Sequence, residues 1–193
     1  MHRHLMPWFV VALSLLASGA AAQEKGKKGV TLGYPASIGL IWHVTDRIAI
    51  RPEFSFAFTS NEVVTTPASL LPGVSGTGVR TDTDTTALAV GVSGLYYLTK
   101  ATSLSAYVSP RFVYTRTRTT TEASTDLLGS SFVNGSSYAV SGVYGVQYAP
   151  IPNINLFGEA GIGFTETNNS STLSVLSGHQ FSTRGGVGMI VYF

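Results

Sequence analysis

The chain has no cysteine, few charged residues and no long apolar run beyond its first 22 residues. Without cysteine, it can form neither a disulfide framework nor a thiolate metal site, and it cannot be anchored through a lipidated amino-terminal cysteine. Charged residues make up 11% of the chain, against about 25% in ordinary soluble domains. The formal net charge of +2 gives no reason to expect a nucleic-acid partner.

The amino-terminal residues follow the pattern of a secretory signal peptide. A short basic start with Arg3 precedes a mostly apolar run over 5–17, and three alanines stand before Gln23. Residues 5–22 together come close to the ~20 residues that a membrane-spanning helix needs, but Pro7 and the small residues favour cleavage. We therefore expect a signal peptide over 1–22 and one mature domain over 23–193.

Apolar side chains alternate with small or polar ones through most of the mature chain. In residues 47–58, six apolar residues share one face, while Arg51 and Glu53 lie on the other, as the two-residue period of a strand requires. Similar segments are 36–44, 87–98, 103–117, 138–148, 153–165 and 187–193. An apolar face opposite a narrow polar one is typical of a barrel with lipid outside and a polar lumen.

Short and long connections alternate along the chain, as they do in outer-membrane barrels. The short connections are 45–46, 99–102 and 149–152, and the long polar ones are 59–86, 118–137 and 166–179. Seven strands are clear, and parity requires an eighth, for which only 28–34 is available; otherwise the barrel closes irregularly. The sequence predicts an all-β fold, an eight-stranded antiparallel up-and-down transmembrane β-barrel. Pro52 and Pro110, inside strands, predict β-bulges.

Several short motifs occur in an order that resembles small OmpA-like outer-membrane barrels. They are Ser37-Ile38-Gly39-Leu40, Thr45-Asp46-Arg47, Arg51-Pro52-Glu53-Phe54, Tyr107-Val108-Ser109-Pro110-Arg111, Phe157-Gly158-Glu159-Ala160-Gly161 and the final Phe193. The resemblance implies the outer membrane of a Gram-negative bacterium, with membrane lipid and lipopolysaccharide as partners. It also implies that Met189, Val191 and Phe193 form the signal read by the barrel-assembly machinery during insertion. No peptidoglycan-binding segment follows, so cell-wall tethering is not implied.

Five charged residues fall on the predicted inner face: Arg51, Glu53, Arg111, Glu159 and Arg184. A lumen of eight strands is just wide enough for side chains to fill, and an isolated charge there would be strongly penalised. We therefore predict a network of salt bridges that plugs the lumen, in which Glu159 pairs with Arg111 or Arg184. An ion-selective constriction is the alternative interpretation.

Other polar residues give weaker signals for chemistry. His179 and Ser182 suggest an esterase, with Glu166 as a third group, but residues three apart on a strand point to opposite faces. Asp82 and Asp84 are spaced to hold Ca²⁺ weakly, although solvated loop charges explain them as well. No phosphate-cradling loop, nucleophile elbow or zinc signature is present in the sequence. We expect no catalytic residue, cofactor or metal.

These observations predict a monomeric, non-enzymatic integral outer-membrane barrel. Its role would be structural, or would consist of surface interactions through its extracellular loops. The alternatives are a narrow channel for small solutes or ions, a barrel resembling lipid A esterases, and a soluble eight-stranded barrel such as a lipocalin.

Overall fold

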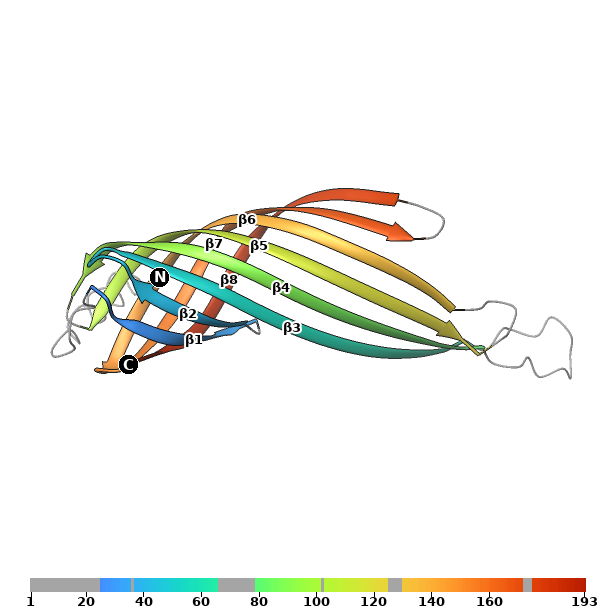
Figure 1. Cartoon of the computed structure of the whole chain (residues 1–193), viewed down its shortest axis with the longest axis horizontal. Helices are drawn as coiled ribbons and strands as arrows, with labels where there is room; N and C mark the ends of the chain where they lie inside the picture. The colour runs from blue at the N-terminus through green and yellow to red at the C-terminus, as the bar shows by residue number, and fades with distance from the viewer. Residues whose placement is uncertain (1–24, 36, 66–78, 102, 125–129, 172–174) are drawn as a thin grey trace, which may run out of the picture.

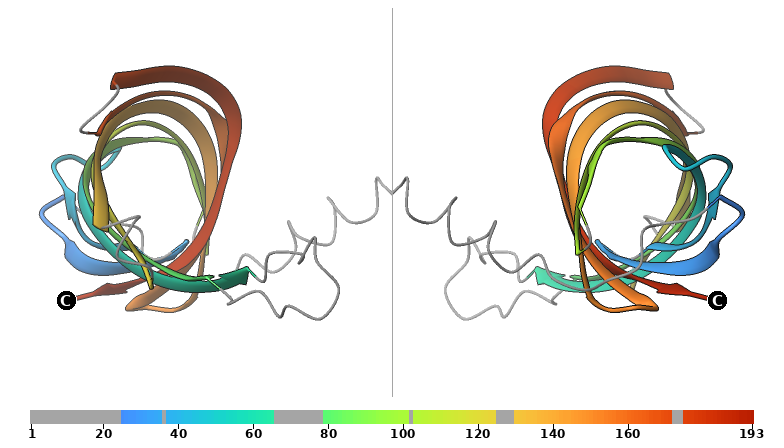
Figure 2. Two further views of the ribbon diagram at one scale, coloured as in Figure 1. Left: turned by 90° about the vertical axis from the view of Figure 1, so that its right-hand side faces the viewer. Right: turned by 90° about the vertical axis from the view of Figure 1, so that its left-hand side faces the viewer.

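The computed structural model describes residues 25–35, 37–65, 79–101, 103–124, 130–171 and 175–193. Within these residues, eight antiparallel strands close into a barrel in which chain neighbours pair and β1 also pairs with β8 (Figures 1 and 2). The strands are β1 Lys28–Tyr34, β2 Ser37–His43, β3 Ile48–Thr65, β4 Val79–Lys100, β5 Leu104–Ala123, β6 Ser130–Ile151, β7 Ile154–Ser171 and β8 Val175–Tyr192. This confirms the predicted fold class. The predicted signal peptide, 1–22, lies outside the described residues.

The inferred first strand is confirmed, because β1 pairs with both β2 and β8. The chain passes from β1 to β2 through Pro35, so almost no loop separates the two strands. The requirement for an even number of strands thus predicted a strand whose own sequence pattern is weak.

The strands differ greatly in length. β1 and β2 have seven residues each, whereas β3 to β8 have between 18 and 22. A transmembrane strand needs about 9–11 residues, so six strands are longer than a bilayer requires. Figure 1 shows them continuing well beyond the β1–β2 hairpin.

The prediction of long polar loops over 59–86, 118–137 and 166–179 is wrong, because most of these residues belong to strands. The β3–β4 ladder continues to Thr65, and the β5–β6 ladder continues to Glu122. These extensions are rich in threonine, which favours strands, and their backbone groups pair in the ladder. The sequence did not reveal them because they lack an apolar face, and therefore lack the alternation that predicts a strand.

The two prolines inside strands are not bulge sites, contrary to the prediction. The β2–β3 ladder is interrupted opposite Pro52 and the β4–β5 ladder opposite Pro110, but each resumes in the same register. A proline removes one donor, and the ladders lose that hydrogen bond without inserting an extra residue. Register shifts lie instead at 97–99 and 148–151, beside short turns.

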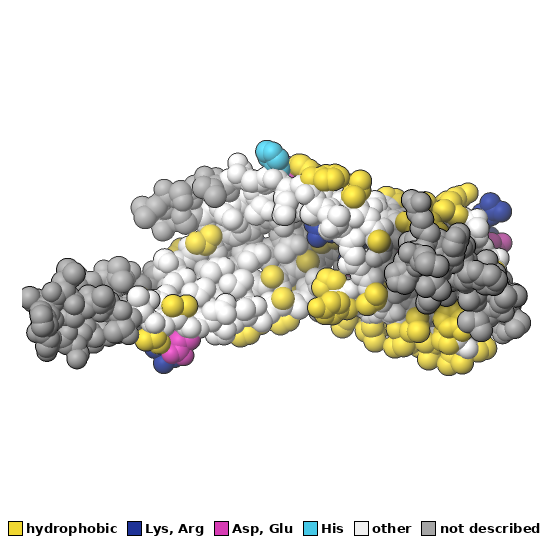
Figure 3. Space-filling view, turned by 180° about the vertical axis from the view of Figure 1, so that it is seen from behind, with side chains coloured by type: hydrophobic (Ala, Val, Ile, Leu, Met, Phe, Trp, Pro, Cys, Tyr) yellow, Lys and Arg dark blue, Asp and Glu magenta, His cyan; other side chains and the backbone are white. Residues whose placement is uncertain are grey.

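Apolar side chains cover the outer face of the barrel around the short-turn half. Figure 3 shows this apolar belt on one side of the molecule, where hydrophobic side chains give way to polar ones toward the long-strand end. Exposed members of the belt include Leu32, Leu40, Phe54, Val90, Phe112, Val140, Leu156 and Val191. Leu40 is 56% exposed and Val90 is 55% exposed, and a continuous apolar surface of this kind is rare on soluble monomeric proteins. Among the described residues, no helix is long and apolar enough to cross a membrane.

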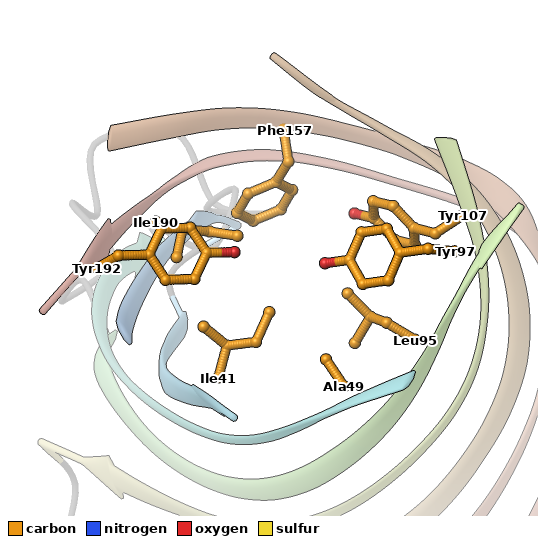
Figure 4. Close-up of a cluster of buried hydrophobic side chains, with 8 residues drawn as sticks. All are labelled: Ile41, Ala49, Leu95, Tyr97, Tyr107, Phe157, Ile190 and Tyr192. Atoms are coloured by element: carbon orange, nitrogen blue, oxygen red, sulfur yellow. The ribbon is translucent and has the colours of Figure 1, made fainter. Parts of the chain in front are cut away.

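The inner face is packed near the short turns. Figure 4 shows eight side chains that point into the ring there: Ile41, Ala49, Leu95, Tyr97, Tyr107, Phe157, Ile190 and Tyr192. They come from β2, β3, β4, β5, β7 and β8, so almost every strand contributes. This buried cluster fills the part of the lumen nearest the short turns, which we call the lower lumen, as expected for a barrel of eight strands.

Candidate functional site

A cluster of buried charges lies directly beyond the aromatic side chains, toward the long-strand end. At its centre is Arg51 of β3, whose side chain is 2% exposed. Its Nη2 lies 2.7 Å from Oε1 of Glu159 on β7, and its Nε lies 2.7 Å from Oε1 of Glu53. The guanidinium carbon also lies 5.2 Å from the centre of the Phe157 ring. Arg51 thus joins opposite walls of the barrel.

Each carboxylate has further partners. Glu53 also pairs with Nη2 of Arg111, and it accepts a hydrogen bond of 3.2 Å from the hydroxyl of Ser93. Glu159 accepts a hydrogen bond of 2.7 Å from the hydroxyl of Tyr107. Because charged groups in a confined lumen are costly without partners, these contacts explain how two carboxylates are held there.

The prediction that Glu159 pairs with Arg111 or Arg184 is wrong. Glu159 pairs with Arg51, and Arg111 pairs with Glu53. Arg184 lies apart from both carboxylates and donates from Nη2 to Oγ1 of Thr165 at 2.6 Å. Alternation places all of these side chains on the inner face, but the stagger between strands decides which of them meet across the lumen.

The sequence did not predict the polar contacts below the charge cluster. His43 Nε2 lies 3.1 Å from the Tyr192 hydroxyl, and the Tyr97 hydroxyl donates to Oε1 of Gln147 at 3.3 Å. Asn155 Nδ2 donates to the same Gln147 oxygen at 3.5 Å. All five residues occupy inward positions among small side chains. Large polar or aromatic residues at such positions are the signal that could have found these contacts.

A cavity of about 560 Å³ lies on the other side of the charge cluster. Arg51, Glu53, Arg111 and Glu159 line its floor, and Arg184 lies on its wall. Small side chains line much of the remainder: Ser55, Ala57, Ala87, Ala89, Ala139 and Ser141. Because these residues are too small to fill the lumen, the barrel is plugged at one end and hollow in its middle.

The residues of the predicted assembly signal lie along one face of the last strand. Met189 and Val191 are on the outer face of β8, and Phe193 follows with 77% of its side chain exposed. The backbone N–H of Phe193 donates to the carbonyl of Lys28 at 3.0 Å, which joins the chain end to β1. Tyr192, between them, points inward and is buried.

The groups suggested for esterase chemistry do not converge. His179 and Glu166 are ladder partners on the outer face, whereas Ser182 is an odd number of residues from His179 and faces the lumen. The His179 ring instead lies 6.3 Å from the Phe164 ring.

Asp82 forms part of a small outer-face ion cluster near the β3–β4 connection. Arg80 lies 3.1 Å from Asp82 and 3.2 Å from Glu62. The hydrogen bond to Asp82 raises the pKa of the Arg80 guanidinium above its ordinary value. Within the described part of the chain, no three histidine or acidic side chains are grouped to hold a metal ion.

Comparisons with known proteins find likeness in structure. The chain is similar to a major outer membrane protein from Thermus thermophilus, with 10% identity, 86% of this chain and 99% of that chain covered, and a TM-score of 0.52. CarO of Acinetobacter baumannii matches with 12% identity over 90% of this chain and 100% of that chain, at a TM-score of 0.42. Ail, the attachment invasion locus protein of Yersinia pestis, matches with 11% identity over 88% and 99%, at a TM-score of 0.40.

No protein-family model and no curated protein sequence matches the chain. At 10% identity, the likeness to the Thermus protein establishes the closed-barrel fold alone.

Proposed function

We propose that the protein is an integral barrel of a Gram-negative outer membrane. The observation that carries this proposal is the apolar belt, which surrounds a closed sheet whose lumen is polar or filled. On β3 the belt extends from Ile48 to Phe58, which matches the ~9–11 residues of a transmembrane strand. A buried core could not form on this face, because its side chains point away from the barrel. A closed sheet also leaves no unpaired backbone within the belt where the ring is complete.

The proposed orientation follows the connections. Outer-membrane barrels have short turns on the periplasmic side and long extensions on the extracellular side. The β1–β2 hairpin turn and the long ends of β3 to β8 would therefore lie on the extracellular side. These six ends form a sheet that is mostly polar on both faces. The outer-face charges Arg80, Asp82 and Glu62 lie on it.

We propose that this protruding sheet gives the protein a structural or surface-interaction role without catalysis. Beyond the apolar belt, its outer edges on β3 after Phe58 and on β8 before Phe181 have no second partner strand among the described residues. Unpaired edge backbone can add a strand from another chain. We further propose that the protein is an OmpA-like barrel, that it is monomeric, and that it contacts membrane lipid and lipopolysaccharide.

A narrow channel is the second candidate, favoured by the cavity in the middle of the lumen. The lower lumen opposes it, since Tyr97, Tyr107 and Arg51 are each at most 2% exposed. We expect the wild-type protein to show no conductance in planar bilayers. Opening of steady channels by the wild type would favour the transport function over the surface role.

The test of the membrane proposal is heat-modifiable migration on SDS gels, run on the membrane fraction of cells that express the full chain. We expect the protein to require detergent for extraction, and to migrate differently before and after boiling, because a closed barrel resists SDS until heated. A protein that stays soluble, with a single mobility, would contradict the membrane assignment.

A further inference from the structure

The barrel wall has a gap beside the charge cluster. β1 pairs with β8 only from Val187 onward, and β2 pairs with β3 only as far as Phe54. Toward the long-strand end, β3 and β8 continue without a strand between them. Figure 3 shows the molecule hollowed on this side, on the long-strand half next to the apolar belt.

The central cavity reaches the outer surface through this gap. Its lining includes Tyr34 and Pro35 at the β1–β2 turn, Phe56 on β3, and Val187 on β8. Phe56 and Val187 belong to the outer face of their strands, where they are 56% and 59% exposed. Side chains of the outer face can line an inner cavity only where the wall between them is missing.

The gap lies within the height of the apolar belt. Beyond Phe54, β3 still carries Phe56 and Phe58 outward, and β8 carries Phe181 outward, with exposures of 56%, 60% and 69%. The ladder partner of Phe56 is Leu88, another exposed apolar residue. In the proposed orientation, the gap therefore opens toward the acyl chains of the outer leaflet.

The charged residues that line the cavity have an excess of positive charge. Three arginines, Arg51, Arg111 and Arg184, face two carboxylates, Glu53 and Glu159. Arg51 is held by both carboxylates, but Arg184 has only the neutral Thr165 hydroxyl, and no described carboxylate lies within ion-pair distance of it.

Arg111 pairs with Glu53 through Nη2 but keeps an unused donor. Its side chain is 29% exposed, and its Nε is a buried donor without an acceptor among the described residues. Arginine forks match phosphate and carboxylate oxygens well. The cavity thus combines arginine N–H donors that can bind an anion with an opening at the height of the lipid acyl chains.

We propose that this lateral cup, bounded by Arg111, Arg184, Ala57, Ala139 and the gap above Pro35, binds one anionic lipid from the outer leaflet. The phosphate head group would contact Arg111 and Arg184, and an acyl chain would leave through the gap between β3 and β8. The small wall side chains leave room for the head group, and the flanking phenylalanines contact the chain. This inference rests on the proposed membrane location.

The test uses the full chain, refolded in dodecylphosphocholine micelles, with carbon-13 labels on its alanine methyl groups. Dodecyl phosphate is the probe, because it has the same chain as the detergent but an anionic head. Ala57, Ala87 and Ala139 report on the cup, whereas Ala106 and Ala160 alternate with inward residues and report on the outer face.

We expect dodecyl phosphate to shift the cup methyl resonances in a saturable manner, and inorganic phosphate at the same concentration to leave them unchanged. Arg184→Gln should weaken the apparent affinity at least tenfold, while Arg184→Lys, which keeps the charge, should retain part of it. Ala139→Phe, which fills the cup and leaves every charge in place, should abolish the shifts.

Absence of cup shifts, equal shifts with inorganic phosphate, or unchanged affinity in both Arg184→Gln and Ala139→Phe would each overturn the lipid site. Magnetisation transfer from detergent chains to Ala106 and Ala160 separates this failure from that of the membrane proposal. Transfer without cup shifts leaves the membrane barrel standing and removes the lipid site, whereas absence of transfer contradicts both.

Discussion

Arg51 and Glu159, which are 108 residues apart in the chain, meet inside the barrel with 2.7 Å between Nη2 and Oε1. The contact ties β3 to β7 across the lumen, and Glu53 adds a second ion pair at Nε of the same guanidinium. Together these residues separate the packed lower lumen from the cavity.

Replacing Arg51 by methionine should destabilise the barrel strongly. Glu53 and Glu159 would remain buried with one partner fewer, and removal of one member of a buried pair costs about 3–5 kcal/mol. Urea unfolding of the refolded protein, followed by tryptophan fluorescence, measures this loss. Arg47→Met, at an exposed position beside the first short turn, is the control and should change stability little. Equal stabilities for the two variants would show that the charge cluster contributes nothing.

Gly145 is required by the ring of Tyr107. A Cβ at residue 145 would collide with the Tyr107 ring, whereas a Cβ at Gly142, on the outer face of the same strand, meets nothing within 4 Å. Overpacking of this kind costs about 1–3 kcal/mol. We expect Gly145→Ala to lower the free energy of unfolding by that amount and Gly142→Ala to leave it nearly unchanged. If Gly142→Ala were the more damaging variant, the inward and outward faces of β6 would be assigned wrongly.

A charge in the middle of the apolar belt should prevent stable insertion. Val90 is 55% exposed on the outer face, and an arginine near the bilayer midplane costs about 2–4 kcal/mol in a membrane barrel. Val90→Arg should therefore lose stability in lipid vesicles, as measured by urea titration. Ser60→Arg, also outward but on the polar extension of β3, is the matched control. A soluble barrel would tolerate both changes equally.

Phe193 should matter for assembly more than for stability. Its side chain is 77% exposed, so Phe193→Ala removes little packing from the folded barrel. We expect less heat-modifiable protein in the membranes of cells, but an unchanged unfolding midpoint after refolding in detergent. Tyr34→Ala removes another exposed aromatic, 76% accessible, away from the last residue and should assemble normally. Normal membrane levels of Phe193→Ala would contradict the predicted assembly signal.

The sequence determined which side chains face inward and which face outward. A strand has a period of two, so alternation in the chain settles the face of each residue once the strand exists. The same logic placed Arg51, Glu53, Arg111, Glu159 and Arg184 in the lumen. The requirement that strands alternate in direction supplied β1, although its seven residues carry little signal of their own.

Only the tertiary structure decided which inward charges meet and how far each strand extends. Contacts across a lumen depend on the stagger that closes the barrel, and no local pattern encodes it, so the partner of Glu159 was predicted wrongly. The polar strand extensions were missed because backbone pairing, rather than an apolar face, holds them. The gap between β3 and β8 was also beyond the sequence, because it depends on the lengths of the strands. It exists only where six long strands close against a short hairpin.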